Sequence, residues 1–418
     1  MGLAAKEHMR TFISCLGCLM IGVLSVTAAG AQITRQDFFD GFEGAWLSNI
    51  KELGRNHFSI EAQQRERFGY QGTLGTWVCA GIHLKGKKVS AGDTVRIVVP
   101  NGNSIAKLRA VYSYDRETWQ PVLTQRAPFD FDVPLKSGYS EVYFATFYPY
   151  FHSQMVAHNR QLHASRYVEF SMLGESVHGR EIPLAIITDP EVPPAQKRRA
   201  FLIGGTHGAE TASIYGVEGM LDFLVLDDPL AAEMRRAVIW KIVPILNVDA
   251  AAEGLDRRNA GGVNVYMDWE GHFGWKPPST NGKPPEHDKS IPSTDFTQPE
   301  TQAVLKAVLE FQPQVFLDVH SWHFAGDGFW GPDPVATNPS TEALKQSIAR
   351  YFKIAHWDHE VLPFTSAPTL IRKLGIAATL PEFALSFDSD NQLKTPESMR
   401  RQGQGVLRGT YEHLKEMK

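Results

Sequence analysis

A histidine and a glutamate three residues apart are the first candidates for chemistry in this chain. His207 and Glu210 follow the apolar run Ala200–Ile203 and precede a segment with helical spacing. We therefore expect His207 on a strand-to-helix turn and Glu210 in the first helical turn, where both can reach one ion. Imidazole and carboxylate are suitable Zn²⁺ ligands. Taken alone, the pair has a simpler interpretation, a helix N-terminus whose macrodipole favours an acidic residue.

A second histidine offers the third ligand. His320 ends the apolar strand expected over Val315–Val319. In open α/β sheets ligands gather at the carboxyl ends of the strands, where His207 would also lie. A lone histidine is more often structural and hydrogen-bonded in the core, but the strand-end His207-x-x-Glu210 pair favours a ligand. Two histidines and one glutamate form a catalytic zinc set that leaves a position for water.

A carboxylate and an arginine extend the candidate set. Glu382 follows the predicted strand Ile376–Leu380 and is placed to act as general base on water and to return the proton to a leaving amine. Its alternative is a helix cap or an exposed ion pair. Arg258 follows the predicted strand Val238–Leu246. A fixed guanidinium there would stabilise charge on the scissile carbonyl, and the alternative is a solvated surface arginine.

These residues need a sheet that brings distant strand ends together. After about Ser165, apolar strands alternate with amphipathic helical stretches, and a closing helix is expected over Pro396–Glu416. The pattern predicts an α/β fold with a mixed, largely parallel central sheet flanked by helices. Two stretches rich in Pro, Gly, Ser and Asp, 271–296 and 327–340, are expected to be long surface loops.

The part of the chain before this sheet has a different pattern. From roughly 58 to 150, short β-branched and aromatic runs are separated by turn residues, which predicts an antiparallel β-sandwich domain. We expect a signal peptide over 1–31, the β-sandwich domain over 32–160 and the catalytic domain over 165–418.

The N-terminus indicates export. Lys6 and Arg10 precede an apolar stretch that leads into small residues, the pattern of a signal peptide cut after Ala31. The alternative is a membrane anchor, because the uncharged stretch 11–34 is long enough to span a bilayer. We expect a periplasmic or secreted protein without stable membrane insertion after cleavage.

Composition narrows the classes of partner. The chain has 418 residues and a formal net charge of −4, without a basic stripe, so no nucleic-acid partner is expected. Cleavage would leave Cys79 as the only cysteine, so we expect no internal disulfide, and any metal must be bound by histidines and carboxylates. The sequence does not determine the oligomeric state.

In this order the motifs resemble those of the zinc carboxypeptidases, or funnelins, and most closely the cytosolic-carboxypeptidase branch with an N-terminal β-sandwich. The matching segments are Gly204–Glu210, Pro244–Asn247, Arg258–Asn259, Gln298–Thr301, Val319–Trp322 and Thr379–Glu382. The resemblance covers nearly the whole predicted mature chain. It implies one Zn²⁺ held by His207, Glu210 and His320. It also implies Glu382 as general base, Arg258 as catalytic arginine, and a peptide substrate contacted by Asn259 and Tyr266.

One departure concerns the substrate's C-terminal carboxylate. The family usually reads Gly-Val-Asp-Leu-Asn-Arg after the arginine motif, and its Asn-Arg pair grips that carboxylate. Here Tyr266 and Met267 occupy those two positions. Methionine cannot bind a carboxylate, and tyrosine offers one hydroxyl donor. Arg257 or Arg372 is a possible substitute.

Three functions follow as hypotheses. Removal of C-terminal residues is the family's usual activity. An amidase or endopeptidase acting on cell-wall or other modified peptides is the alternative, because of Tyr266 and Met267. A non-catalytic binding module with a vestigial zinc site belongs to another class, and the intact set of ligands, base and arginine argues against it.

Overall fold

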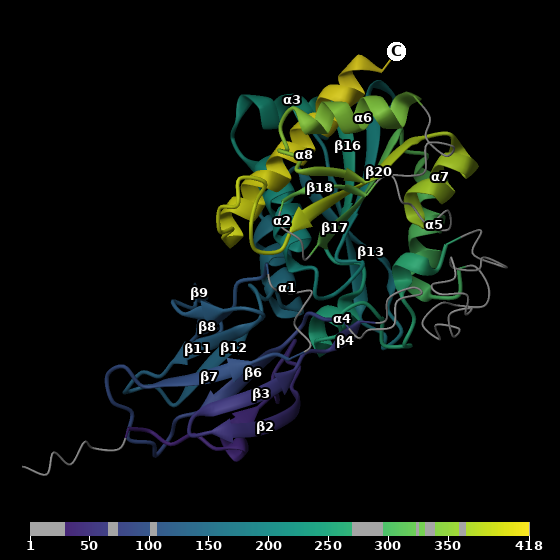
Figure 1. The fold of residues 1–418 in the computed structure, drawn as a ribbon. Helices are drawn as coiled ribbons and strands as arrows, with labels where there is room; N and C mark the ends of the chain where they lie inside the picture. Colours follow the sequence, from purple (N-terminus) through teal and green to yellow (C-terminus); the bar gives the residue numbers. More distant parts are fainter. Residues whose placement is uncertain are drawn as a thin grey trace, which may run out of the picture.

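The computed structural model describes residues 30–65, 74–100, 107–269, 296–322, 326–330, 339–358 and 365–417. Figure 1 shows a β-rich N-terminal part, coloured purple to blue, beside a larger part in which helices flank one sheet. Almost all of the predicted signal peptide and most of both predicted loops, 271–296 and 327–340, lie outside the described residues.

The N-terminal part consists of two facing five-stranded sheets and a short two-stranded ribbon. The first sheet has the order β1 (Phe38–Phe39), β6 (Cys79–His83), β12 (Glu141–Ala145), β8 (Val111–Ser113), β9 (Gln120–Pro121). The second has the order β10 (Gln125–Arg126), β11 (Asp130–Pro134), β7 (Thr94–Val98), β3 (His57–Glu61), β2 (Ser48–Gly54). The ribbon pairs β4 (Gln64–Arg65) with β5 (Leu74–Gly75).

Side-chain alternation explains why these strands form a sandwich. On β7, Val95 and Ile97 are buried while the residues between and beside them are more exposed, the period of a strand with one face on a core. Phe58 of β3 and Phe144 of β12 are fully buried. The described pairs are antiparallel except for β3 and β7, which run parallel. The predicted β-sandwich is therefore confirmed, with one parallel pair in its second sheet.

The C-terminal part is built on one mixed sheet of eight strands. Its order is β13 (Val168–Glu175), β14 (Glu181–Ile187), β16 (Val238–Val243), β15 (Arg198–Gly204), β17 (Val315–Trp322), β20 (Ala377–Ala384), β18 (Gly328–Trp330), β19 (His356–Asp358). The four central strands β16, β15, β17 and β20 run parallel to one another. Strand β14 pairs antiparallel with β13 and β16, and β18 pairs antiparallel with β20 but parallel with β19. This confirms the predicted mixed, largely parallel sheet.

Helices cover both faces of this sheet (Figure 1). The helices are α1 (His152–Leu162), α2 (Thr211–Val225), α3 (Pro229–Ala237), α4 (Val248–Glu253), α5 (Pro299–Phe311), α6 (Pro339–Ala349), α7 (Ser366–Leu374), α8 (Pro396–Glu416). Helix α2 packs against α8 on one face, and α5 and α7 lie on the other. The closing helix has the bounds that the sequence predicts, because its proline at the first turn and Thr395 cap favour that start. Within the described residues, no helix has the length and apolar character needed to cross a membrane.

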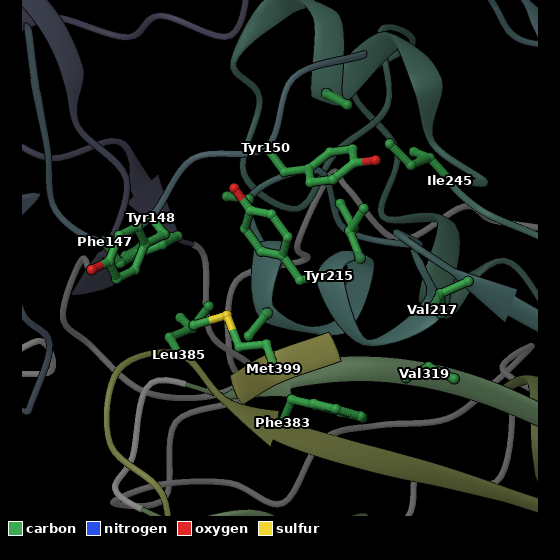
Figure 2. Packing of buried hydrophobic residues seen from close by; sticks show 14 of the residues in the cluster. Phe147, Tyr148, Tyr150, Tyr215, Val217, Ile245, Val319, Phe383, Leu385 and Met399 are labelled. Carbon is green, nitrogen blue, oxygen red and sulfur yellow. The ribbon is translucent and has the colours of Figure 1, made fainter. Parts of the chain in front are cut away.

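An aromatic segment joins the two parts of the molecule. Figure 2 shows Tyr150, which follows β12, beside Tyr215 of α2, with Phe147 and Tyr148 of the same segment also labelled. The Tyr150 and Tyr215 rings meet edge to face, with centroids 4.9 Å apart. Burying one such side chain contributes about 1.5–3 kcal/mol, so this contact helps to hold the sandwich against the larger part.

Candidate active site

The first metal-binding motif lies on a tight turn between β15 and α2. Gly205 has φ +59°, and a Cβ there would lie 2.9 Å from Cγ2 of Ile245, so glycine is the residue that fits. The turn continues to His207 and Glu210, where the Glu210 N–H donates to the His207 carbonyl at 3.2 Å. Glu210 is the N-cap residue of α2 and precedes its first helical turn, one position earlier than predicted.

His320 and Glu382 come from neighbouring strands of the sheet. They are paired in register across the parallel strands β17 and β20, so both side chains point to the same face at the same level. Both strands extend further than predicted, and each residue lies within its strand. His207, Glu210, His320 and Glu382 are all buried.

The carboxylate of Glu210 lies between the two histidines. Its Oε1 is 2.8 Å from Nδ1 of His207 and its Oε2 is 3.0 Å from Nδ1 of His320. One ligand atom from each of the three residues lies within 4.8 Å of the others. The Ser321 N–H also donates to Oε2 of Glu210 at 2.9 Å, which fixes the carboxylate. The three predicted ligands therefore converge through their Nδ1 and carboxylate atoms.

Side chains behind the histidines orient them. Nε2 of His207 is 3.0 Å from Oδ1 of Asn264, and Nε2 of His320 is 3.0 Å from Oδ1 of Asp318. Metal-binding histidines commonly use the second ring nitrogen in this way, since the contact fixes the tautomer and the ring plane. Sequence analysis missed both partners. Asp318 carries a signal, because it lies two residues before His320 and so faces the same side of β17, whereas Asn264 has none.

The charges at this cluster suit a cation. Burial raises the pKa of Glu210, but the two histidines outweigh burial and hold this pKa well below its usual range. Burial lowers the pKa of His320, but the charge of Asp318 and its contact with Glu210 outweigh that effect and raise the pKa well above the usual range. A buried field that stabilises an imidazolium also stabilises a metal ion, so the donor set fits Zn²⁺.

Glu382 has the properties of an acid–base group. Burial raises the pKa of Glu382 to about 8. The negative charge of Glu210 also raises this pKa, whereas the charges of His320 and Arg257 oppose the rise. A carboxyl group with a raised pKa both accepts and releases a proton near neutral pH.

The arginine beside the ligands is Arg257. Its Nη2 lies 3.6 Å from Oε1 of Glu210. The sequence assigned the catalytic role to Arg258, whose backbone forms a bridge with Asn264.

The two predicted substrate-binding residues, Asn259 and Tyr266, differ in what they contact. Both ends of the Asn259 amide are engaged: Nδ2 donates to Gln298 and Glu300 at the start of α5, and Oδ1 accepts from backbone N–H groups of its own loop. These contacts favour a role in holding the loop. The Tyr266 ring packs on both ligand histidines, with centroids 5.7 and 4.9 Å away, while Met267 is fully buried.

The hydroxyl of Tyr266 is engaged by Thr365. Burial raises the pKa of Tyr266, and a hydrogen bond with Thr365 opposes that rise. The phenol therefore stays neutral at physiological pH.

Comparison with known proteins shows which family the chain is similar to. Residues 155–360 match the family model described as zinc carboxypeptidase. Cytosolic carboxypeptidase 6 from Homo sapiens is 29% identical over 288 residues, which covers 68% of this chain and 50% of the relative. The Mus musculus protein of the same name is 24% identical over 288 residues, covering 68% of this chain and 46% of the relative. The chain thus spans about half the length of these curated relatives.

Solved structures share the fold over nearly the whole chain. A metallo-carboxypeptidase from Pseudomonas aeruginosa has a TM-score of 0.71 at 20% identity, covering 90% of this chain and 99% of that chain. A metallo-carboxypeptidase from Burkholderia cenocepacia has a TM-score of 0.71 at 19% identity, covering 90% of this chain and 98% of that chain. At these identities the likeness concerns the fold.

The relatives also correct one prediction. The curated relatives just described are named cytosolic carboxypeptidases, which contradicts the expected signal peptide and the expected periplasmic or secreted location. The positive-then-apolar pattern of the N-terminus is therefore not a reliable sign of export in this chain. Residues 1–29, which carry that pattern, lie outside the described residues.

Proposed function

We propose that this chain is a metallocarboxypeptidase of the zinc carboxypeptidase family, which removes C-terminal residues from a peptide substrate. One Zn²⁺ ion would be held by Nδ1 of His207, Nδ1 of His320 and the carboxylate of Glu210. The observation that carries this proposal is the convergence of these atoms within 4.8 Å of one another, with Glu382 paired in register beside His320.

The residues that surround the three candidate ligands support a role in metal binding. When bound, Zn²⁺ supplies Lewis-acid catalysis by polarising a carbonyl and acidifying water. Asn264 and Asp318 keep both imidazoles turned so that their Nδ1 atoms face the ion. Asp318 is itself held, because Thr206 donates to Oδ1 at 2.8 Å and Ser366 donates to Oδ2 at 2.6 Å.

Glu382 and Arg257 are the residues that we assign to the chemical step. Glu382 would take a proton from the attacking water and give it to the leaving amine, a double role that suits its pKa of about 8. The guanidinium of Arg257, 3.6 Å from Glu210, would stabilise the negative charge that develops on the scissile carbonyl oxygen. We assign this role to Arg257 in place of Arg258, since Arg257 is the arginine in contact with a ligand.

The division of the chain into domains is part of the proposal. We propose a β-sandwich domain over 32–160 and a catalytic domain over 165–418. The strand positions support this division: the two sandwich sheets use strands between Phe38 and Ala145, and the mixed sheet uses strands from Val168 onward.

A product analysis tests the activity. Purified protein would be incubated with a mixed peptide set, each peptide with a free and with an amidated C-terminus, and products would be identified by mass spectrometry. We expect stepwise loss of single residues from free C-termini, abolished by a chelator and restored by Zn²⁺. The variant His320→Ala serves as the ligand-deficient control and should be inactive.

Two results would contradict the proposal. Full activity of His320→Ala would remove the metal centre from the mechanism. Equal or internal cleavage of amidated peptides would instead identify an amidase or endopeptidase, the alternative that the replacement of the usual Asn-Arg pair by Tyr266 and Met267 raises. The carboxypeptidase relatives do not favour that alternative.

A further inference from the structure

The loop that carries Arg257 lies directly against the β-sandwich. Helix α4 ends at Gly254, whose φ is +72°, and a Cβ there would lie 2.3 Å from the carbonyl oxygen of Ala45. The Gly44 N–H donates to the Ala252 carbonyl at 2.9 Å. The backbone of the sandwich thus contacts the end of α4, two residues before the loop reaches Asp256.

Asp256, the residue before Arg257, is held from three directions. Its Oδ2 accepts a hydrogen bond from Oγ1 of Thr76 at 2.8 Å, and its N–H donates to Oε1 of Gln63. Its carbonyl accepts from the Ala209 N–H at 3.4 Å, within the turn that bears the metal ligands. Asp256 is 3% exposed, so these contacts lie away from solvent. They connect the sandwich to the metal turn through one residue.

The sandwich side of this connection is itself fixed. Thr76 is fully buried, and its carbonyl accepts from Oγ1 of Thr146 at 2.6 Å. The Gln63 N–H donates to the Trp77 carbonyl at 2.9 Å, and Nε1 of Trp77 donates to the Gly44 carbonyl at 3.2 Å. The groups that bind Asp256 therefore belong to an ordered part of the sandwich.

The position of Asp256 determines where the side chain of Arg257 leaves the backbone. The Asp256 carbonyl and the Arg257 N–H belong to one planar peptide unit, so fixing Asp256 fixes the start of the Arg257 side chain. From there the guanidinium reaches to 3.6 Å from Glu210. A displacement of about 1 Å at a catalytic group can reduce the rate about 100-fold, so the accuracy of this placement matters.

We propose that Thr76 and Gln63 are positioning residues that act through Asp256 to hold the Arg257 guanidinium beside the metal ligands. The β-sandwich then contributes to turnover through its contacts with the loop that carries Arg257. This inference rests on the proposed function, because it gives Arg257 its role in stabilising the reacting carbonyl.

The test replaces the hydroxyl of Thr76 and keeps its shape. We expect Thr76→Val to lower kcat by about tenfold or more while KM changes less than about twofold, because the arginine acts mainly in the transition state. Thr76→Ser, which keeps the hydroxyl, should retain the parent kcat. The matched control is Ser113→Ala, which removes a buried hydroxyl whose bonds stay within the sandwich, to Asp115 and Arg116.

A double-mutant cycle separates positioning from general destabilisation. In an Arg257→Ala background, Thr76→Val should cause no further loss of kcat, since the group that it positions is gone. Amide hydrogen exchange provides a readout that does not need activity. Thr76→Val should speed exchange at the amides of Asp256 and Arg257, whereas the control Ser113→Ala should exchange there as the parent does. If Thr76→Val does not fold, Gln63→Leu removes the acceptor of the Asp256 N–H and gives the same test at a half-buried position.

Each outcome points to one of the two proposals. A folded Thr76→Val protein with the parent kcat, or an equal loss of kcat with and without Arg257, overturns the positioning role while the carboxypeptidase stands. Unchanged exchange at Asp256 overturns it as well. A parent protein that releases no C-terminal residue in the presence of Zn²⁺ refutes the proposed function, and hydrogen exchange then still decides whether Thr76 holds the loop.

Discussion

His320 and Glu382 lie opposite each other on adjacent parallel strands, so a candidate metal ligand and the candidate base share one level of the sheet. Backbone hydrogen bonds of β17 and β20 fix this relationship, and both side chains are buried. Strands hold functional groups more accurately than loops do, and the pairing therefore keeps the candidate base at a constant distance from His320.

Glu382→Gln should abolish most turnover and leave the metal in place. Amide and carboxyl have nearly the same shape, but the amide cannot accept the proton, so kcat should fall by about 10²- to 10⁴-fold. The measurement is kcat alongside zinc content by elemental analysis. A variant that keeps its zinc and retains activity within a few-fold of the parent would remove Glu382 from the mechanism.

Asp318→Asn should weaken zinc binding. The change removes the negative charge behind His320, and loss of such an outer contact typically reduces metal affinity by about 10- to 100-fold. Competition with a chromogenic chelator measures the affinity. Asp132→Asn, which removes an equal charge from the sandwich where Asp132 pairs with Arg126, is the control and should bind zinc as the parent does. Equal affinities of the two variants would contradict the orienting role.

Asp249→Asn should change how stability depends on pH. Burial raises the pKa of Asp249, but hydrogen bonds from the His178 N–H, Arg180 and Ser176 outweigh it and leave this pKa below its ordinary value. A carboxyl group whose pKa is lower in the folded state than in the unfolded state stabilises the folded state. This stabilisation is fully present above the unfolded pKa of about 3.9 and is lost as the pH falls through the folded pKa. We expect a loss of about 2 kcal/mol at pH 7 that shrinks towards zero in acid.

Urea unfolding across pH measures this effect. Asp222→Asn is the control, because Asp222 is 41% exposed beside His158 and should contribute less than about 1 kcal/mol. A loss for Asp249→Asn that stayed constant down to pH 3 would show that the carboxylate charge is not its cause.

Met267→Arg should destabilise the protein without restoring the family's carboxylate anchor. Met267 is fully buried, and a guanidinium placed there without a partner should lower the free energy of unfolding by about 4 kcal/mol or more. Met267→Leu keeps the apolar volume and should cost less than about 1.5 kcal/mol. Thermal unfolding compares the two. A stable Met267→Arg protein with faster release of C-terminal residues would show that this position faces the substrate.

The sequence allowed much of the site to be predicted because its residues lie beside regular elements. His207, Glu210 and His320 stand at or near strand ends, where apolar patterns indicate the strand, and the structure brings them together. Which residue of an irregular loop faces the cluster was harder to predict. No periodicity distinguishes Arg257 from Arg258, and the choice depends on how Asp256 is held by Thr76, 180 residues away in the chain. Asn264 reaches His207 across a similarly irregular loop, which no local pattern encodes.

The place of β20 in the sheet has a consequence for biosynthesis. This strand lies between β17 and β18, although it is made after both and after β19. While the ribosome is still completing Ala377–Ala384, β17 has an unpaired edge in the middle of the future sheet, and such edges can pair with other chains. Glu382 arrives on the same late strand. The nascent chain therefore acquires its candidate base only when its central edge is closed, so a chain interrupted before this point would be both inactive and prone to aggregate.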